Sequence, residues 1–240
     1  MPSAADVRAL EEVGYGIWVV PDVEELDGWR LRYADGLTNR ANSVFPNAAG
    51  SVPLDERIDR AERWYAERGA GAGFQVTEAS LPVGLVDTLA RRGYAVAAGP
   101  VSVQTAGLPA LEADARVELA AEPGDDWLAL WGESRGARDA GVARALLTGG
   151  AGRTAFAQIP GLAVGRAVAI GEWLGITSML TVPAARRQGL GRAVLATLVA
   201  WGRAAGARRG YLQTDNPVAI ALYASVGFAE RYTYRHLRRP

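Results

Sequence analysis

The sequence predicts an α/β protein built from two related lobes joined by a linker. Apolar residues with the spacing of strands and of helices alternate along most of the chain. One stretch of small and polar residues has no period, and a similar pattern of aromatic and glycine residues lies on each side of it. We therefore expect an N-terminal lobe over residues 1–108, a linker over 109–115 and a C-terminal lobe over 116–240.

Composition excludes several classes of function. The chain of 240 residues carries 26 basic and 26 acidic side chains, so it has no net field that would attract nucleic acid or a membrane surface. Cysteine is absent, which excludes disulfides, thiolate metal sites and a cysteine nucleophile, and we expect no metal. No leader-like start and no apolar window of membrane length occurs. These features predict an unprocessed cytoplasmic protein, a monomer or homodimer, with a small-molecule partner.

Local patterns predict the elements of both lobes. In the first lobe we expect a short helix near the start, strands over 16–20, 28–34, 74–77 and 101–104, and helices over 53–68 and 85–90. In the second we expect strands over 117–119, 154–159, 163–170, 173–182, 211–214 and 228–235, and helices over 127–131, 140–147, 194–206 and 218–226. Asn216 and Pro217 are typical of a helix start, and Gly227 of a helix end.

The two lobes share a pattern that suggests duplication. Trp201, Gly206, Tyr211 and Thr214 repeat the spacing of four residues in the first lobe, namely Trp64, Gly69, Phe74 and Thr77. Gly227-Phe228 likewise repeats Gly93-Tyr94 after a small slip in a loop. The first lobe has no counterpart of the glycine loop at 186–191, and it has Leu89 where the second has Tyr223. We interpret it as a degenerate copy; chance similarity of two α/β segments is the alternative.

Residues 180–195 contain the main candidate for a ligand site in the second lobe. They predict a strand, a tight loop containing Gly189 and Gly191, and then a helix. Glycine lets the backbone turn and bring its amides close to a ligand, and the helix directs its positive end to the same place. This is a cradle for a diphosphate. It is neither a P-loop, since no Gly-Lys-Ser/Thr follows, nor a dinucleotide fingerprint, since Ala193 and Val194 stand where a third glycine would be needed.

Residues 186–191, with Val182-Pro183 before them and 216–228 after them, resemble the GCN5-related N-acetyltransferase (GNAT) family over about residues 116–240. The resemblance implies a mixed sheet that opens in the middle to take acetyl-CoA as cosubstrate, one per chain. It implies that the backbone of Leu180, Thr181 and Val182 pairs with the pantetheine arm and that Asn216 touches that arm. The pyrophosphate would be held by the amides of Arg187, Gln188, Gly189, Leu190, Gly191 and Arg192.

The first lobe resembles the partner lobe of tandem GNAT proteins. Residues 36–46 further resemble a signature of an actinobacterial subgroup that includes proposed glutamate N-acetyltransferases. The polar run 38–46 within this segment is rich in side chains that donate and accept hydrogen bonds, so it is a candidate pocket wall, and Arg40, Asn42 and Ser43 are candidate substrate contacts if the substrate is held between the lobes. The alternative is that these polar side chains cap turns, as such residues commonly do.

Acetyl transfer to an amine needs an unprotonated amine, a stabilised oxyanion and a proton for the departing thiolate. Tyr223 stands where the family's usual general acid lies; the alternative is a core tyrosine. Glu172 is our candidate base, bridged by water, although it could equally be a solvated turn residue. Asp215 is a weaker candidate.

A rival pattern is Gly-x-Ser-x-Gly at 132–136, centred on Ser134, which with His236 would suggest a hydrolase. The preceding residues predict a helix and not the strand that a nucleophile elbow requires. We expect His236 at the surface, and Arg235, Arg238 and Arg239 either in a solvated tail or reaching an acidic substrate or the 3′-phosphate of CoA.

The sequence thus predicts transfer of acetyl from acetyl-CoA to the primary amine of a small molecule, for example glutamate, by direct attack in a ternary complex. The alternative from another class is a catalytically silent acyl-CoA-binding or sensory module.

Overall fold

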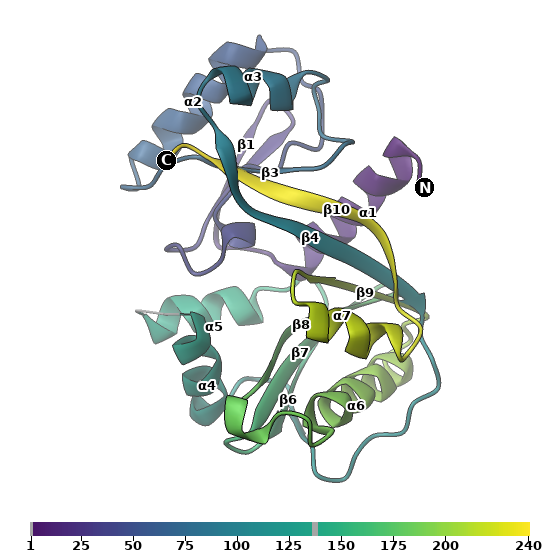
Figure 1. Ribbon diagram of the computed structural model, residues 1–240. Helices are drawn as coiled ribbons and strands as arrows, with labels where there is room; N and C mark the ends of the chain where they lie inside the picture. Colours follow the sequence, from purple (N-terminus) through teal and green to yellow (C-terminus); the bar gives the residue numbers. More distant parts are fainter. Residues whose placement is uncertain (1, 136–138) are drawn as a thin grey trace. The chain divides into compact units, whose positions relative to one another are not determined.

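The computed structural model describes residues 2–135 and 139–240, which form two compact units (Figure 1). The first unit takes in the chain up to Glu12, Val20–Ser102 and Tyr232–Pro240, and the second takes in Val13–Val19 and Val103–Arg231. Both differ from the lobes that local patterns suggest, because 13–19 groups with the second unit and 232–240 with the first. These assignments come from packing and strand pairing, which a local pattern does not contain.

The first unit has a small sheet with helices and a separate hairpin. Its strands follow the order β3, β10, β4, and β10 pairs antiparallel with β3 from Arg235↔Val76 to Arg238↔Gly73. The hairpin pairs β1 with β2. The elements that contribute to this unit are α1 (Ala4–Ile17, up to Glu12), β1 (Asp22–Leu26), β2 (Trp29–Tyr33), η1 (Asn39–Ala41), α2 (Leu54–Ala66), β3 (Gly73–Val76), α3 (Leu85–Arg91), β4 (Ala95–Gly107, to Ser102) and β10 (Ala229–Arg238, from Tyr232).

Helix α2 provides one apolar face of the core of the first unit. Its residues Ile58, Ala61, Trp64 and Tyr65 fall at helical spacing and are all buried. The same core contains Trp29, which packs edge-on against Phe74 of β3 with ring centroids 5.7 Å apart. The helix predicted over 53–68 is therefore confirmed, and its apolar stripe is the face that covers the sheet.

The second unit is built on a mixed sheet. Strands β5 to β8 are antiparallel neighbours, of which β6 to β8 form a meander, and β9 then pairs parallel with β8. The predicted mixed α/β sheet is thereby confirmed. Its elements are β5 (Glu118–Ala120), α4 (Asp125–Arg135), α5 (Ala140–Thr148), β6 (Arg153–Ile159), β7 (Ala163–Ile170), β8 (Trp173–Thr181), η2 (Pro183–Ala185), α6 (Leu190–Ala204), β9 (Arg209–Thr214) and α7 (Pro217–Ala224), with the ends of α1 and β4.

Helices cover the two faces of this sheet (Figure 1). Helix α6 packs Val194 and Leu198 against the small residues of β6 and β7. On the opposite face, Trp127 of α4 donates its indole N–H to the carbonyl of Ala157 at 3.0 Å and meets the ring of Phe156 edge-on. Among the described helices, none combines the length and the apolar character needed to cross a membrane.

Three local expectations are wrong. Residues 16–20 are not a strand, because Gly16 and Ile17 complete α1 and no strand follows before Asp22. Strand β1 is absent from the sequence prediction, since its Asp and Glu residues hide the pattern. Strand β4 runs well beyond the expected 101–104 on both sides. Short apolar runs do not distinguish a helix end from a strand, so length and partners decide.

The internal repeat extends to the backbone conformation. The order α2–β3–α3–β4 matches α6–β9–α7–β10. Gly69 and Gly206, which follow the first helix of each set, have φ of 66° and 100°; Gly93 and Gly227, which follow the second, have φ of 83° and 93°. The paired glycines thus end equivalent helices in the same left-handed conformation. This agreement favours two related lobes over a chance similarity.

The end of α1 is pressed against the sheet of the second unit at Gly175, and this contact predicts a stability effect. A Cβ on Gly175 would collide with the side chain of Ile17. Gly175→Ala should therefore lower the free energy of unfolding by about 1–3 kcal/mol in urea denaturation. Gly107→Ala is the matched control, since a Cβ there meets nothing within 4 Å. Equal stability of the two variants would contradict the contact.

Candidate active site

Strands β8 and β9 separate halfway along the sheet. Their parallel pairing runs from Trp173↔Arg209 to Ile176↔Leu212, whereas β8 continues to Thr181 and β9 to Thr214. Beyond Ile176 the edge of β8 that faces β9 has no strand partner in this pairing. Backbone N–H and C=O groups at such an edge can pair with an extended ligand. This opening is the feature that the GNAT resemblance implies.

A β-bulge lies at the point where the strands separate. On β7 the register moves two residues, from Val164 to Arg166, while on β8 it moves three, from Leu180 to Thr177. Within this bulge Ser178 has a φ of 55°, a left-handed conformation that is uncommon for serine. Bulges re-aim backbone and side-chain groups and are frequent beside active sites. Sequence reasoning missed Ser178, because nothing in its neighbours distinguishes it from an ordinary strand residue.

The glycine loop after β8 ends in the N-terminus of α6. Gly189 is the N-cap residue with a φ of 77°, and Arg187 also has a positive φ, of 61°. The amides of the first turn of α6, including Leu190 and Gly191, have no partner within the helix and lie at its positive end. A diphosphate is the kind of anion that such a terminus binds. The strand, loop and helix predicted for 180–195 are present.

The predicted diphosphate residues differ in their surroundings. Arg187, Gln188, Gly189 and Arg192 are exposed, whereas Leu190 is 6% exposed and packs in the core. Arg192 donates to the hydroxyl of Ser225 at 3.0 Å, and Gln188 donates to the carbonyl of Ala184 at 3.4 Å. Because the side chain of Leu190 packs in the core, only its backbone can contact a ligand. Binding of CoA by these residues stays a prediction.

The three residues predicted to pair with the pantetheine arm are not equivalent. Val182 donates its amide to the carbonyl of Leu162 at 2.9 Å, on the β7 side. The carbonyl of Thr181 accepts from Arg186 at 3.3 Å, and Leu180 is paired in register with Val164. Since backbone groups alternate along a strand, the amide of Val182 is directed away from the open edge. Pairing of this backbone with a ligand stays a prediction. Of the three residues, Thr181 is the one whose backbone is best placed for it.

Asn216 forms the helix cap predicted from the sequence. Its side-chain oxygen accepts from the amides of Val218 at 2.9 Å and Ala219 at 3.4 Å, and Pro217 is the first residue of α7. This satisfies two of the orphan donors of the helix. Capping therefore accounts for Asn216, and contact with the cosubstrate stays a prediction.

Tyr223 lies on α7 and is only 5% exposed. It packs beside Phe228, with ring centroids 6.2 Å apart. Burial raises the pKa of its phenol to about 12. Within the described part of the chain, no side chain or backbone group forms a hydrogen bond with its hydroxyl. Tyr223 is thus a core residue with a protonated hydroxyl, and its role as general acid stays a prediction.

Glu172 lies in the turn before β8, away from the bulge. Its side chain is exposed and forms an ion pair with Arg209 at 3.4 Å, and its carbonyl accepts from two backbone amides. Six residues of extended chain, roughly 20 Å, separate Glu172 from Ser178. This geometry fits the solvated turn residue. A role as base stays a prediction that the position of Glu172 does not favour, and Asp215 is likewise exposed.

The candidate substrate residues lie in the first unit, where other contacts use them. Asn42 accepts from the amides of Ala34 and Gly36 at 2.8 and 2.9 Å and donates to the carbonyl of Thr38 at 2.8 Å. Ser43 is fully buried and accepts from Arg32 at 3.1 Å. The bonds of Asn42 agree with the turn-capping alternative, whereas Ser43 bonds to a distant side chain.

Arg40 donates through Nε to the hydroxyl of Tyr234 at 2.9 Å. Substrate binding by Arg40, Asn42 and Ser43 stays a prediction, and the bonds above show that the last two already have structural roles.

The hydrolase pattern does not form a nucleophile elbow. Ser134 is part of helix α4 and donates its hydroxyl to the carbonyl of Trp131 at 2.6 Å, while Gly136 lies outside the described residues. A serine in a helix lacks the strained strand-to-helix turn that exposes the nucleophile.

The expectations of a surface His236 and of a solvated C-terminal tail are wrong. His236 is not at the surface but 4% exposed on β10, where burial and then the positive charges of Arg40 and Arg32 lower its pKa to about 3. Arg238 donates to the carbonyl of Asn42 at 2.8 Å, so this segment is a paired strand and not a solvated tail. Local sequence gave no sign of the pairing with β3.

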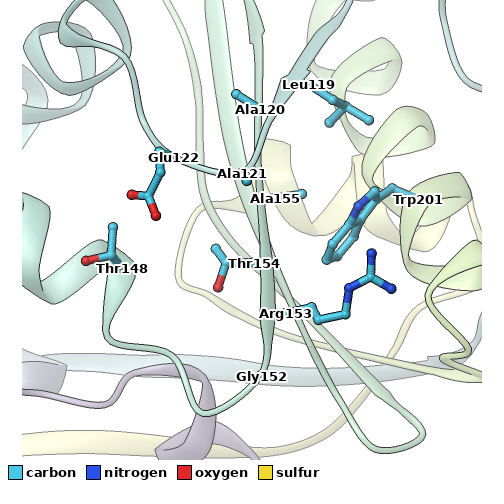
Figure 2. A pocket seen from close by; sticks show the side chains of 10 residues that line it. All are labelled: Leu119, Ala120, Ala121, Glu122, Thr148, Gly152, Arg153, Thr154, Ala155 and Trp201. Carbon is cyan, nitrogen blue, oxygen red and sulfur yellow. The ribbon is translucent and has the colours of Figure 1, made fainter.

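A separate hollow of about 480 Å³ lies elsewhere in the second unit. Figure 2 shows Arg153 beside the indole of Trp201, and Glu122 near Thr148 on the other side. Trp201 is roughly 16 Å along α6 from the glycine loop, and none of the predicted site residues lines this hollow. Among the described residues, no cluster of side chains suited to a metal ion occurs.

The mixed sheet with a parted β8–β9 pair, a bulge and a glycine loop before a helix defines an acetyltransferase of the GNAT fold. A family model described as "Probable histone acetyltransferase Rv0428c C-terminal" matches residues 4–237. The chain therefore belongs to this family of GNAT acetyltransferases.

Relatives and solved structures agree with this assignment. The Mycobacterium tuberculosis protein "Probable histone acetyltransferase Rv0428c" is 31% identical over 97% of this chain and 74% of its own length. "Uncharacterized N-acetyltransferase YobR" of Bacillus subtilis is 26% identical over 93% and 95%. A GCN5-related N-acetyltransferase from Kribbella flavida has a TM-score of 0.68 at 18% identity, covering 100% of this chain and 96% of that one. A tandem GNAT protein from the clavulanic acid biosynthesis pathway has a TM-score of 0.57 at 16% identity, covering 77% and 68%.

The glycine loop allows a test of ligand approach that is separate from folding. A Cβ on Gly191 would lie 3.5 Å from Thr181 Oγ1 and 3.6 Å from Leu222, which are ordinary contacts. Gly191→Ala should therefore fold normally but lose about tenfold or more in acetyl-CoA affinity, because the methyl group obstructs an anion at the helix end. Isothermal titration calorimetry measures this, with Gly124→Ala as control. Unchanged affinity would exclude close approach at Gly191.

Proposed function

We propose that this protein transfers the acetyl group of acetyl-CoA to the primary amine of a small molecule. The observation that carries the proposal is the opening beyond Ile176↔Leu212, with the bulge at Ser178 on one strand and the helix N-terminus of α6 after it. An extended arm fits along the unpaired edge of β8, and a diphosphate fits the amides at Gly189 and Gly191. Acetyl-CoA combines these two parts in one molecule.

Different residues around the opening have different roles in the reaction. The left-handed backbone at Ser178 re-aims groups of β8 toward the opening, where they can stabilise negative charge on the acetyl oxygen. Tyr223 holds a proton at its hydroxyl and can deliver it to the departing sulfur. The amine attacks directly in a ternary complex, so no side chain of this chain needs to be acylated.

An amino acid such as glutamate is the acceptor that we propose to examine first. The name of the mycobacterial relative refers to histones, so a lysine-containing peptide belongs in the same panel. The panel is completed by a polyamine, which offers primary amines without a carboxylate.

Release of free CoA in the presence of this panel tests the proposed activity. We expect turnover that depends on the amine, because direct attack requires an unprotonated acceptor. The control is acetyl-CoA alone, which reports hydrolysis. Binding of acetyl-CoA without turnover on any amine would overturn the proposal and favour the silent acyl-CoA-binding module.

The proton donor is tested by Tyr223→Phe. We expect kcat to fall by about 10²–10⁴ with little change in KM for acetyl-CoA, since only the hydroxyl is removed. Burial raises the pKa of Tyr223 to about 12. The phenol therefore keeps its proton as the pH rises to about 10, and the wild-type rate should not decline below that pH through loss of this acid. The pH profile of kcat measures this.

The control for this variant is Tyr211→Phe. Tyr211 is another buried tyrosine of the second unit, and it accepts a hydrogen bond from Gln213. A Tyr223→Phe enzyme with full kcat would remove the acid role.

A further inference from the structure

Arg166 is a fully buried arginine that the chemistry described above does not use. It lies on β7 with 0% of its surface exposed. Its Nη1 donates to the carbonyl of Ile17 at 3.1 Å, and its guanidinium lies 5.5 Å from the ring centroid of Trp18. Within the described part of the chain, Nε and Nη2 have no hydrogen-bond partner. An arginine carries five N–H donors, so most of its capacity is unused.

No carboxylate of the described residues compensates this charge. Burial is the sole cause that lowers the pKa of Arg166, to about 10, and no ion pair opposes it. The side chain therefore remains charged at neutral pH. A buried and unpaired charge is costly, and buried charges in proteins normally have a partner of opposite sign. This arrangement calls for an anion that the described residues do not supply.

The neighbours of Arg166 show which face of the sheet its side chain occupies near the separation of β8 and β9. A Cβ on the preceding residue, Gly165, would meet Met179, Val194 and Leu198, so Gly165 faces α6. Side chains alternate along a strand, and Arg166 therefore points to the other face of the sheet.

On that face its register partner is Thr177, which immediately precedes the bulge residue Ser178. The side-chain oxygens of Thr177 and Ser178 are also buried and without a hydrogen-bond partner among the described residues. Unused hydrogen-bonding capacity of three residues thus lies at the bulge.

We propose that Arg166 and Thr177 bind a carboxylate of the substrate, next to the point where the acetyl group is transferred. A planar carboxylate can accept two parallel N–H bonds from a guanidinium and a third bond from a hydroxyl. Thr177 as a residue is half-buried, whereas its hydroxyl and the unused nitrogens of Arg166 are buried, so a carboxylate reaches them from the unpaired edge of β8 by displacing the side chains that cover them. This inference rests on the proposed acetyl transfer and assigns a carboxylate to one of the two substrates, either an amine acceptor such as an amino acid or the acyl chain of the donor.

Two sources of the carboxylate are distinguished by substrate pairs. In the first arm, acetyl-CoA is the donor, and alanine is compared with alaninamide as acceptor. In the second arm the acceptor is alaninamide, and succinyl-CoA is compared with butyryl-CoA as donor. We expect the carboxylate to raise kcat/KM by about 10- to 100-fold in one arm, as hydrogen bonds to a charged group do. A preference for the carboxylate in the first arm assigns the site to the acceptor, and a preference in the second arm assigns it to the acyl chain.

Arg166→Met and Thr177→Val test the assignment to these residues. Each variant should remove most of this preference while the affinity for CoA is kept. Arg153→Met and Thr154→Val are matched controls on the neighbouring strand and should keep the preference. Thr177→Val provides the answer should Arg166→Met fail to fold. A wild-type enzyme with no preference in either arm, or a preference that Thr177→Val and a folded Arg166→Met both retain, would overturn the proposal.

A binding measurement separates this inference from the proposed function. With saturating CoA, alanine should raise the melting temperature of the wild-type protein more than alaninamide. In a separate measurement without CoA, succinyl-CoA should raise it more than butyryl-CoA if the acyl chain provides the carboxylate. Arg166→Met or Thr177→Val should lose the difference. If no amine is acetylated but the difference persists, the activity is wrong and the carboxylate site stands. If amines are acetylated and no difference is seen in either pair, the site is wrong and the activity stands.

Discussion

The early end of the β8–β9 pairing is the constraint on which the rest of the second unit depends. Because the two strands are parallel, their C-terminal ends lie at the same edge of the sheet. Each strand leads there into a helix: α7 begins at Pro217 soon after β9 ends at Thr214, and α6 begins at Leu190 after the longer glycine loop that follows Thr181. Two helix N-termini thus lie beside an edge with unpaired backbone. A polar, extended ligand can satisfy that edge, which water would otherwise have to do.

The bulge connects this edge to the opposite neighbour of β8. One extra residue on β8 brings Thr177 opposite Arg166 while Leu180 stays opposite Val164. The extra residue interrupts the regular alternation of side chains along β8. Ser178, with its left-handed backbone, lies within this bulge and two residues beyond Ile176, where the pairing with β9 ends. The bulge therefore coincides with the separation of the strands and also determines which residue of β8 lies opposite Arg166.

Sequence reasoning found the features that depend on local chemistry. The glycine loop, the Asn216 cap and the stripe of α2 follow from glycine, capping and periodicity, and each is present. It missed features set by tertiary contacts. The bulge at Ser178 depends on the strands beside it, and the burial of Arg166 depends on Ile17 and Trp18, far away in sequence. Glu172, the candidate base that the sequence suggests, is separated from the bulge by half the length of β8.

The two related lobes keep equivalent helices and glycines but use their sheets differently. In the first unit, Leu89 takes the place of Tyr223 and is fully buried, so that position offers no hydroxyl to a ligand. Polar groups there bond to one another: Arg32 donates to Gln75, and Gln75 donates to Glu11 at 2.7 Å. Both units contain buried polar atoms that no described residue satisfies: in the first unit they are spread over α2, the end of α3 and β10, at Arg57, Trp64, Arg92 and His236, whereas those of Arg166, Thr177 and Ser178 lie on two paired strands at the bulge. Buried polar groups that satisfy one another stabilise a fold, whereas unsatisfied ones beside an open strand edge favour binding. This difference supports one acetyl-CoA site per chain, in the second unit.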